Sequence, residues 1–206
     1  MKILNLAAGK FDPLVIPGDN LSMFPQYIVN VDTSYYDEGD QPGLIEYDMR
    51  NWEDDPDRIS KTVYLNLDVF EFMERCKVKF DRVVIYRFLE HVSFTQVEYF
   101  IYLVSTVLNK DGLVDVIVPN YRILAQSILD EDRWEQEYKE FNFQNHNITL
   151  TTELLNEPSC PHASIWTPKR MIRFWELEGR FTVEKNYPSF EFDGRDLYLR
   201  SIIKRV

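Results

Sequence analysis

The most constraining feature of the sequence is a strand, helix, strand pattern between residues 82 and 118. Arg82 to Tyr86 and Leu113 to Val118 are short Val/Ile-rich runs, which are typical of strands buried on both faces of a sheet. The segment between them repeats apolar residues at helical spacing, at positions 97, 100, 101, 104, 107 and 108. Because antiparallel neighbours need no helix to connect them, the pattern predicts a parallel pair of strands.

The ends of two helices are marked in the sequence. Ser93 and Gln96 form a candidate capping box at the start of the first helix, and residues 109–112 (Asn-Lys-Asp-Gly) predict its stop. A second helix is predicted from a capping Thr167 to Gly179, with a proline in its first turn.

Further apolar runs predict the rest of a sheet. The expected strands are Ile3 to Leu6, Tyr27 to Val31, Thr62 to Leu67, Phe181 to Asn186 and Leu197 to Ile203. Alternating strands and helices predict one α/β domain over residues 1–206. The charged stretch at about 121–161 is interpreted as an insertion on the substrate side of that domain.

The charge balance restricts the partners. The chain has 23 Lys and Arg against 34 Asp and Glu, a formal net charge of −11. Binding to a phosphate backbone depends on basic side chains that displace counterions, so a nucleic acid is not expected as the main partner. Cys76 and Cys160 are too few for a disulfide framework and lack the spacing of a zinc site with the histidines. With no signal peptide and no membrane span recognised, we expect a cytoplasmic protein.

Small and acidic residues recur where the predicted strands end. The first strand runs into Ala7, Ala8 and Gly9, and Asp32 follows the second strand. A turn of small residues lets the backbone approach a ligand closely, and an acid after the second strand can accept hydrogen bonds from ribose hydroxyls. Taken alone, these residues fit a nucleotide site and a tight turn beside a surface aspartate equally well.

The same arrangement continues downstream. Asp68 follows the third strand, and the fourth strand leads into Leu-Glu-His at residues 89–91. Here the sequence resembles the class I S-adenosylmethionine-dependent methyltransferases, and among them small predicted methyltransferases with a Leu-Glu-His signature. The likeness covers nearly the whole chain, including the segment from His162 to Pro168 and the Gly-Arg-Phe at residues 179–181.

This resemblance implies a Rossmann-like, mostly parallel seven-stranded sheet with its last strand antiparallel and helices on both faces. It implies S-adenosylmethionine as the cofactor and methyl transfer to an unidentified acceptor, which the negative net charge predicts to be a small molecule or a protein. The positions that it implies for cofactor binding are Ala7, Ala8 and Gly9 beside the methionine part, Asp32 at the ribose hydroxyls, Asp68 and Val69 at the adenine, and Tyr86 and Arg87 beside the methyl group.

Three residues are candidates for catalysis, and each has a structural alternative. Glu90 and His91 can instead start a helix and tie the loop to the sheet, because a fold shared by many substrates seldom keeps its base in the common frame. His162 can instead pack or form a hydrogen bond. Trp166 is interpreted as core rather than as an acceptor platform. Asp68 can instead cap the helix that begins near Val69.

Two other functions remain open. The first turn has Ala7 where the family commonly has glycine, and no third glycine follows, which also fits a non-catalytic protein that keeps the fold for binding or scaffolding. A nicotinamide-dependent oxidoreductase shares the order of strand, turn and acid but expects a glycine-rich turn that opens a helix directly. Prolines at positions 13 and 17 interrupt that helix, so this function ranks last.

Overall fold

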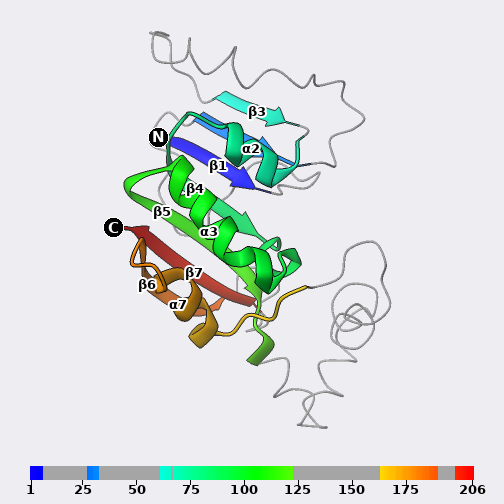
Figure 1. Cartoon of the computed structure of the whole chain (residues 1–206), viewed down its shortest axis with the longest axis vertical. Helices are drawn as coiled ribbons and strands as arrows, with labels where there is room; N and C mark the ends of the chain where they lie inside the picture. The colour runs from blue at the N-terminus through cyan, green and yellow to red at the C-terminus, as the bar shows by residue number, and fades with distance from the viewer. Residues whose placement is uncertain (7–26, 33–60, 66, 123–162, 190–197) are drawn as a thin grey trace.

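The computed structural model describes residues 1–6, 27–32, 61–65, 67–122, 163–189 and 198–206, whose strands form one seven-stranded sheet of order β3-β2-β1-β4-β5-β7-β6 (Figure 1). The strands are β1 (Lys2–Leu6), β2 (Tyr27–Val31), β3 (Lys61–Leu65), β4 (Phe80–Tyr86), β5 (Leu108–Pro119), β6 (Phe181–Ser189) and β7 (Tyr198–Arg205). The helices are α2 (Val69–Arg75), η2 (Leu89–His91, a 3-10 helix), α3 (Phe94–Val107) and α7 (Pro168–Glu176).

Strand direction agrees with the expected fold. The pairs β1·β2, β2·β3, β1·β4 and β4·β5 are parallel. β7 lies between β5 and β6 and pairs antiparallel with both, so it alone among the described strands is reversed. This confirms the mostly parallel sheet with an antiparallel last strand, and it confirms the parallel pair predicted from residues 82–118.

The junction between α3 and β5 differs from the prediction. α3 ends at Val107 and β5 begins at the next residue, so the stop predicted at residues 109–112 is wrong. Leu108 already has extended backbone angles (φ −95°, ψ 142°). The polar residues that follow lie in the irregular first part of β5, where Asp111 has a φ of 63° and the pairing with β4 shifts register. A polar run therefore marks an irregular strand start here rather than a helix end.

The predicted helix caps have mixed outcomes. Ser93 is the N-cap of α3, but its hydroxyl donates to Oε1 of Gln96 at 3.0 Å and caps no backbone N–H, so the capping box is wrong. Thr167 does cap α7, because its Oγ1 accepts from the N–H of Arg170 at 3.3 Å. α7 ends at Glu176, before the expected Gly179, which has a φ of 65° in the turn after the helix.

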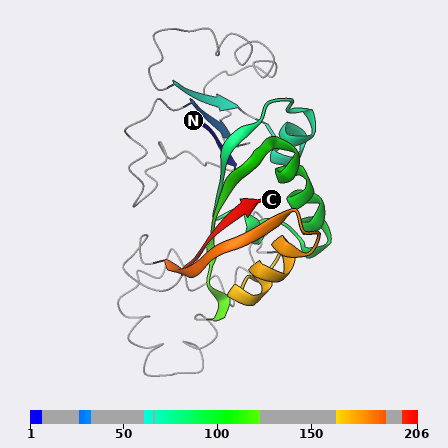
Figure 2. The same ribbon diagram turned by 90° about the vertical axis from the view of Figure 1, so that its left-hand side faces the viewer.

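α2, α3 and α7 cover one face of the sheet (Figure 2). The core between them is apolar, and its largest fully buried side chains include Phe72, Phe80, Phe100, Trp166, Trp175 and Phe181. The expectation of helices on the opposite face falls on residues outside the described ranges. No helix in the described part of the chain is long and apolar enough to cross a bilayer.

The opposite face of the sheet carries a buried ionic cluster. Asp115 is fully buried on β5, and its carboxylate accepts from Arg82 of β4 (Nη2, 2.8 Å) and from Arg200 of β7 (Nη2, 2.6 Å; Nε, 3.0 Å). Alternate residues of a strand face opposite sides, so the flanking Val114 and Val116 point into the helix-side core. The cluster therefore links the reversed β7 to two parallel strands.

Candidate functional site

The candidate site lies at the carboxyl ends of the parallel strands. β1 is flanked by β2 on one side and β4 on the other, so the chain connections diverge at this point of the sheet. Ligands of open α/β sheets bind outside the strand carboxyl ends at such a switch point. Asp32 directly follows β2 at this edge, is half-buried, and donates its backbone N–H to the carbonyl of Leu65 at 3.1 Å.

Asp68 caps α2. Its Oδ1 accepts from the backbone N–H of Phe70 at 2.9 Å and of Glu71 at 3.1 Å, and the next residue, Val69, is buried in the core. The structural alternative for Asp68 is therefore confirmed. The side chain stays exposed at the same edge as Asp32, so capping does not remove it from the site.

Replacing Asp68 with alanine should lower the free energy of unfolding by about 0.5–2 kcal/mol, because two backbone N–H groups of α2 lose their acceptor. Urea denaturation measures the change. Asp68→Asn is the matched control, since asparagine caps about as well as aspartate and should keep most of the stability. Equal stability of wild type and the alanine variant would show that the cap contributes nothing.

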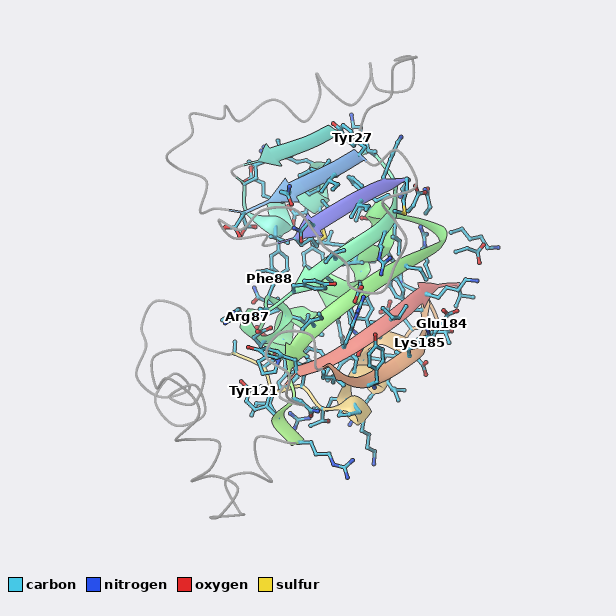
Figure 3. All side chains as sticks on the ribbon, turned by 180° about the vertical axis from the view of Figure 1, so that it is seen from behind. Tyr27, Arg87, Phe88, Tyr121, Glu184 and Lys185 are labelled. Carbon is cyan, nitrogen blue, oxygen red and sulfur yellow. The ribbon has the colours of Figure 1, made fainter. Side chains whose placement is uncertain are left out.

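The end of β4 has an unusual backbone. Arg87 follows Tyr86 with a φ of 54°, the left-handed region that costs a non-glycine residue about 1–2 kcal/mol. Its N–H donates to the carbonyl of Ile117 at 2.8 Å, which holds this turn against β5. Figure 3 shows Arg87 and Phe88 at the same edge of the sheet as Tyr121, which follows β5.

Tyr86 connects this edge to the ionic cluster. Its hydroxyl lies 3.4 Å from Oδ2 of Asp115. Burial raises the pKa of Tyr86 above its usual range, and the negative charge of Asp115 raises it further. The phenol is therefore neutral and serves as a donor.

The Leu-Glu-His segment forms η2. Hydrogen bonds connect η2 to residues 163–166, which are here called the strap. The carbonyl of Glu90 accepts from the N–H groups of Ala163 at 2.8 Å and Ser164 at 2.9 Å. His91 is half-buried and donates its N–H to the carbonyl of Phe88 at 2.8 Å. Their backbones thus form a short helix of their own, and Glu90 ties it to the strap rather than to the sheet, while α3 begins after its N-cap Ser93.

Trp166 fixes the strap from inside. It is fully buried, and its Nε1 donates to Oγ of Ser164 at 2.8 Å and to the carbonyl of Leu89 at 3.3 Å. Its own carbonyl accepts from the N–H of Tyr121 at 3.3 Å. The interpretation of Trp166 as core is confirmed, and the strap bridges the segments that follow β4 and β5.

Two buried oxygens at this edge lack a hydrogen-bond partner among the described residues: Oε2 of Glu90 and Oδ1 of Asn120. Burial raises the pKa of Glu90 to about 8, while a hydrogen bond from its own N–H and the charge of Arg87 act in the opposite direction. Sequence reasoning did not propose Asn120. The available signal was a polar residue that directly follows a buried strand.

Some predicted site residues are not placed. Ala7, Ala8, Gly9 and His162 lie outside the described ranges. The described part of the chain brings Asp32, Asp68 and the segment from Tyr86 to His91 to one edge of the sheet. Within it, no three His, Cys, Asp or Glu side chains are grouped so that they could hold a metal ion.

Comparison with known proteins supports the fold. No family model matches the sequence, and no curated protein matches it. A methyltransferase dependent on S-adenosylmethionine from Methanosarcina mazei has a similar structure, with a TM-score of 0.54 and 14% identity over 100% of this chain and 92% of that one. The N-methyltransferase NodS from Bradyrhizobium japonicum gives a TM-score of 0.51 and 14% identity over 99% and 85%.

The PH0226 protein from Pyrococcus horikoshii is similar to the same degree, with a TM-score of 0.54 and 14% identity over 100% of this chain and 82% of that one. The chain therefore has the Rossmann-like fold of the S-adenosylmethionine-dependent methyltransferases. At a sequence identity of 14%, the likeness concerns the fold alone.

Proposed function

We propose that the protein is an S-adenosylmethionine-dependent methyltransferase. The observation that carries the proposal is the strand order β3-β2-β1-β4-β5-β7-β6 with β7 alone reversed among the described strands. The common dinucleotide-binding order 3-2-1-4-5-6 belongs to a mostly parallel sheet and has no reversed strand between its last two. This difference favours methyl transfer over the nicotinamide-dependent alternative.

The residues at the strand ends fit this cofactor. Asp32 offers a carboxylate at the end of β2, which suits the two donor hydroxyls of a ribose. Asp68 and Val69 would border the adenine, and Tyr86 with Arg87 would border the methyl group. Ala7, Ala8 and Gly9 complete the proposed cofactor site beside the methionine part.

Methyl transfer requires little chemistry from the protein. The cofactor supplies a methyl group that is already activated on a sulfonium, so the residues mainly hold an acceptor in line with it. Orientation of this kind can be worth about 7–11 kcal/mol of the barrier. A general base adds a factor of about 10² to 10⁴ where the acceptor must lose a proton. Glu90, His91 and His162 are the proposed candidates for that role.

S-adenosylhomocysteine should bind the folded protein and raise its apparent stability. At a ligand concentration 100 times the Kd, the expected gain is about 2.7 kcal/mol. Calorimetric titration and thermal unfolding measure the two effects. Asp32→Asn should weaken binding at least tenfold, because a hydrogen bond to a charged group is worth about 1.5–3 kcal/mol.

Asp81→Asn is the matched control. Asp81 lies near the start of β4, at the opposite edge of the sheet, where it accepts from the N–H of Lys2 and from Asn109, both at 2.8 Å. This variant should bind the ligand like wild type. A folded wild-type protein that binds neither S-adenosylmethionine nor S-adenosylhomocysteine would refute the proposal and leave a binding or scaffolding role.

The acceptor is proposed to be a small molecule or a protein. The net charge of −11 opposes attraction to a phosphate backbone. Methyl transfer from labelled cofactor to fractions of a cell extract would identify the class. Label that enters only nucleic acid would contradict this part of the proposal.

A further inference from the structure

The unpartnered oxygens of Glu90 and Asn120 lie past the ends of two neighbouring parallel strands. β4 and β5 are in register at Tyr86 and Ile117, so Glu90 follows the paired end by four residues and Asn120 by three. The side chain of Glu90 is 1% exposed and that of Asn120 is 2% exposed. Both therefore sit inside the edge that the proposed function uses.

The backbone holds both residues in place. The strap donates two N–H groups to the carbonyl of Glu90 and accepts one from Tyr121, the residue after Asn120. The hydroxyl of Ser164 also donates to the carbonyl of Leu89 at 3.0 Å. Because these bonds use main-chain groups, they leave Oε2 of Glu90 and Oδ1 of Asn120 without a donor in the described part of the chain.

Such a pair is expensive to bury unless something donates to it. Native proteins satisfy nearly all their buried polar groups, and the exceptions call for an explanation such as a ligand. Above the pKa of Glu90 its carboxylate oxygen accepts, as the amide oxygen of Asn120 does, so one partner that serves both must donate at least two hydrogens. A hydroxyl has one hydrogen to give, whereas a primary ammonium has three.

We propose that Glu90 and Asn120 form the subsite for the amine nitrogen of the methyl acceptor, with the carboxylate of Glu90 as its base. The inference rests on the proposed function and names the class of acceptor. The titratable groups near Glu90 on its own loop are Arg87 and His91, and the strap that packs against it (Ala-Ser-Ile-Trp) has no titratable side chain.

The step balances in protons and electrons. An N–H proton of the ammonium passes to the carboxylate of Glu90, which leaves a neutral amine and a carboxylic acid. The nitrogen lone pair then forms the new N–C bond to the methyl carbon while the C–S bond breaks and its electron pair stays on sulfur. The positive charge of the sulfonium is transferred to the methylated nitrogen.

The test uses n-propylammonium and 1-propanol as probes, each titrated into the full chain with and without S-adenosylhomocysteine. Saturation-transfer NMR measures binding one pH unit above the pKa of Glu90. The ammonium should bind wild type at least tenfold more tightly than the alcohol. Glu90→Gln should abolish that preference, and Asn120→Ala should weaken ammonium binding severalfold. Glu98→Gln, the same change on the exposed side of α3, should bind like wild type.

A second measurement uses the wild-type protein alone, so its result does not depend on whether a variant folds. Carbon-detected NMR of wild type follows the titration of the Glu90 carboxyl, and n-propylammonium should lower its pKa because linkage is reciprocal. Equal binding of ammonium and alcohol, or a carboxyl titration that ignores the ammonium, would overturn the inference. If S-adenosylhomocysteine still binds in those samples, the proposed function survives; if it does not bind, both fail.

Discussion

Replacing Asp115 with asparagine should lower the free energy of unfolding by about 3–5 kcal/mol, because two buried guanidinium groups lose the charge that compensates them. Asp115 is fully buried, and Arg82 and Arg200 are 6% and 3% exposed. Asparagine keeps the shape of the side chain, so the loss reports charge and hydrogen bonding rather than a cavity. Urea denaturation followed by circular dichroism gives the midpoint and slope of unfolding.

Asp111→Asn is the matched control for this prediction. Asp111 lies on the same strand and pairs with Lys204 at 2.9 Å, but its side chain is 65% exposed. Exposed ion pairs typically contribute about 0.2–1 kcal/mol, so this variant should stay close to wild type. If the two variants lose the same stability, the cluster does not hold β7 electrostatically.

Replacing Trp166 with alanine should lower the free energy of unfolding by about 3–5 kcal/mol through the cavity that it leaves. The ring is fully buried and packs against Phe94 and Phe174, with centroids 5.9 and 5.6 Å away. The same change removes the indole N–H, which donates to Oγ of Ser164 and to the carbonyl oxygen of Leu89. The strap should therefore be held less tightly against η2. Denaturation measures the stability, and hydrogen exchange at the N–H groups of residues 163 and 164 measures the strap.

Trp166→Phe separates the two contributions. Phenylalanine keeps an aromatic ring in the core but has no N–H, and a typical hydrogen bond contributes about 0.5–1.5 kcal/mol. Hydrogen exchange at the N–H groups of residues 163 and 164 should therefore be faster in both variants. Only the alanine variant should show the full decrease of about 3–5 kcal/mol in the free energy of unfolding. An alanine variant with unchanged stability would contradict the assignment of Trp166 to the core.

The strands were predictable because their composition is decisive. β4 and the part of β5 after Gly112 are rich in Val and Ile, which fits a sheet buried on both faces, and their connection through α3 fixes them as parallel. The reversal of β7 was available from the family resemblance alone, because the residues of a strand carry no sign of its direction. The start of β5 was missed because a polar run resembles a turn whether or not the strand has already begun.

The site was predictable in position more than in detail. Strand ends locate Asp32, Asp68 and the Leu-Glu-His segment, because consecutive parallel strands deliver their ends to one edge. The orphan oxygens were not predictable, since they depend on how the strap packs against η2 from more than 70 residues away in the chain. Asp115 did leave a sequence signal, an acid inside the apolar run from Leu113 to Val118.

The place of β7 between β5 and β6 also sets an order of assembly during synthesis. β6 leaves the ribosome before β7, yet it joins the described sheet through β7. The five parallel strands can pair as they emerge, but β6 has no strand to pair with until Tyr198–Arg205 has followed it. A nascent chain that has released β6 while Tyr198–Arg205 is still held in the ribosome would therefore expose two unpaired strand edges, one on β5 and one on β6, and each edge is a template for aggregation.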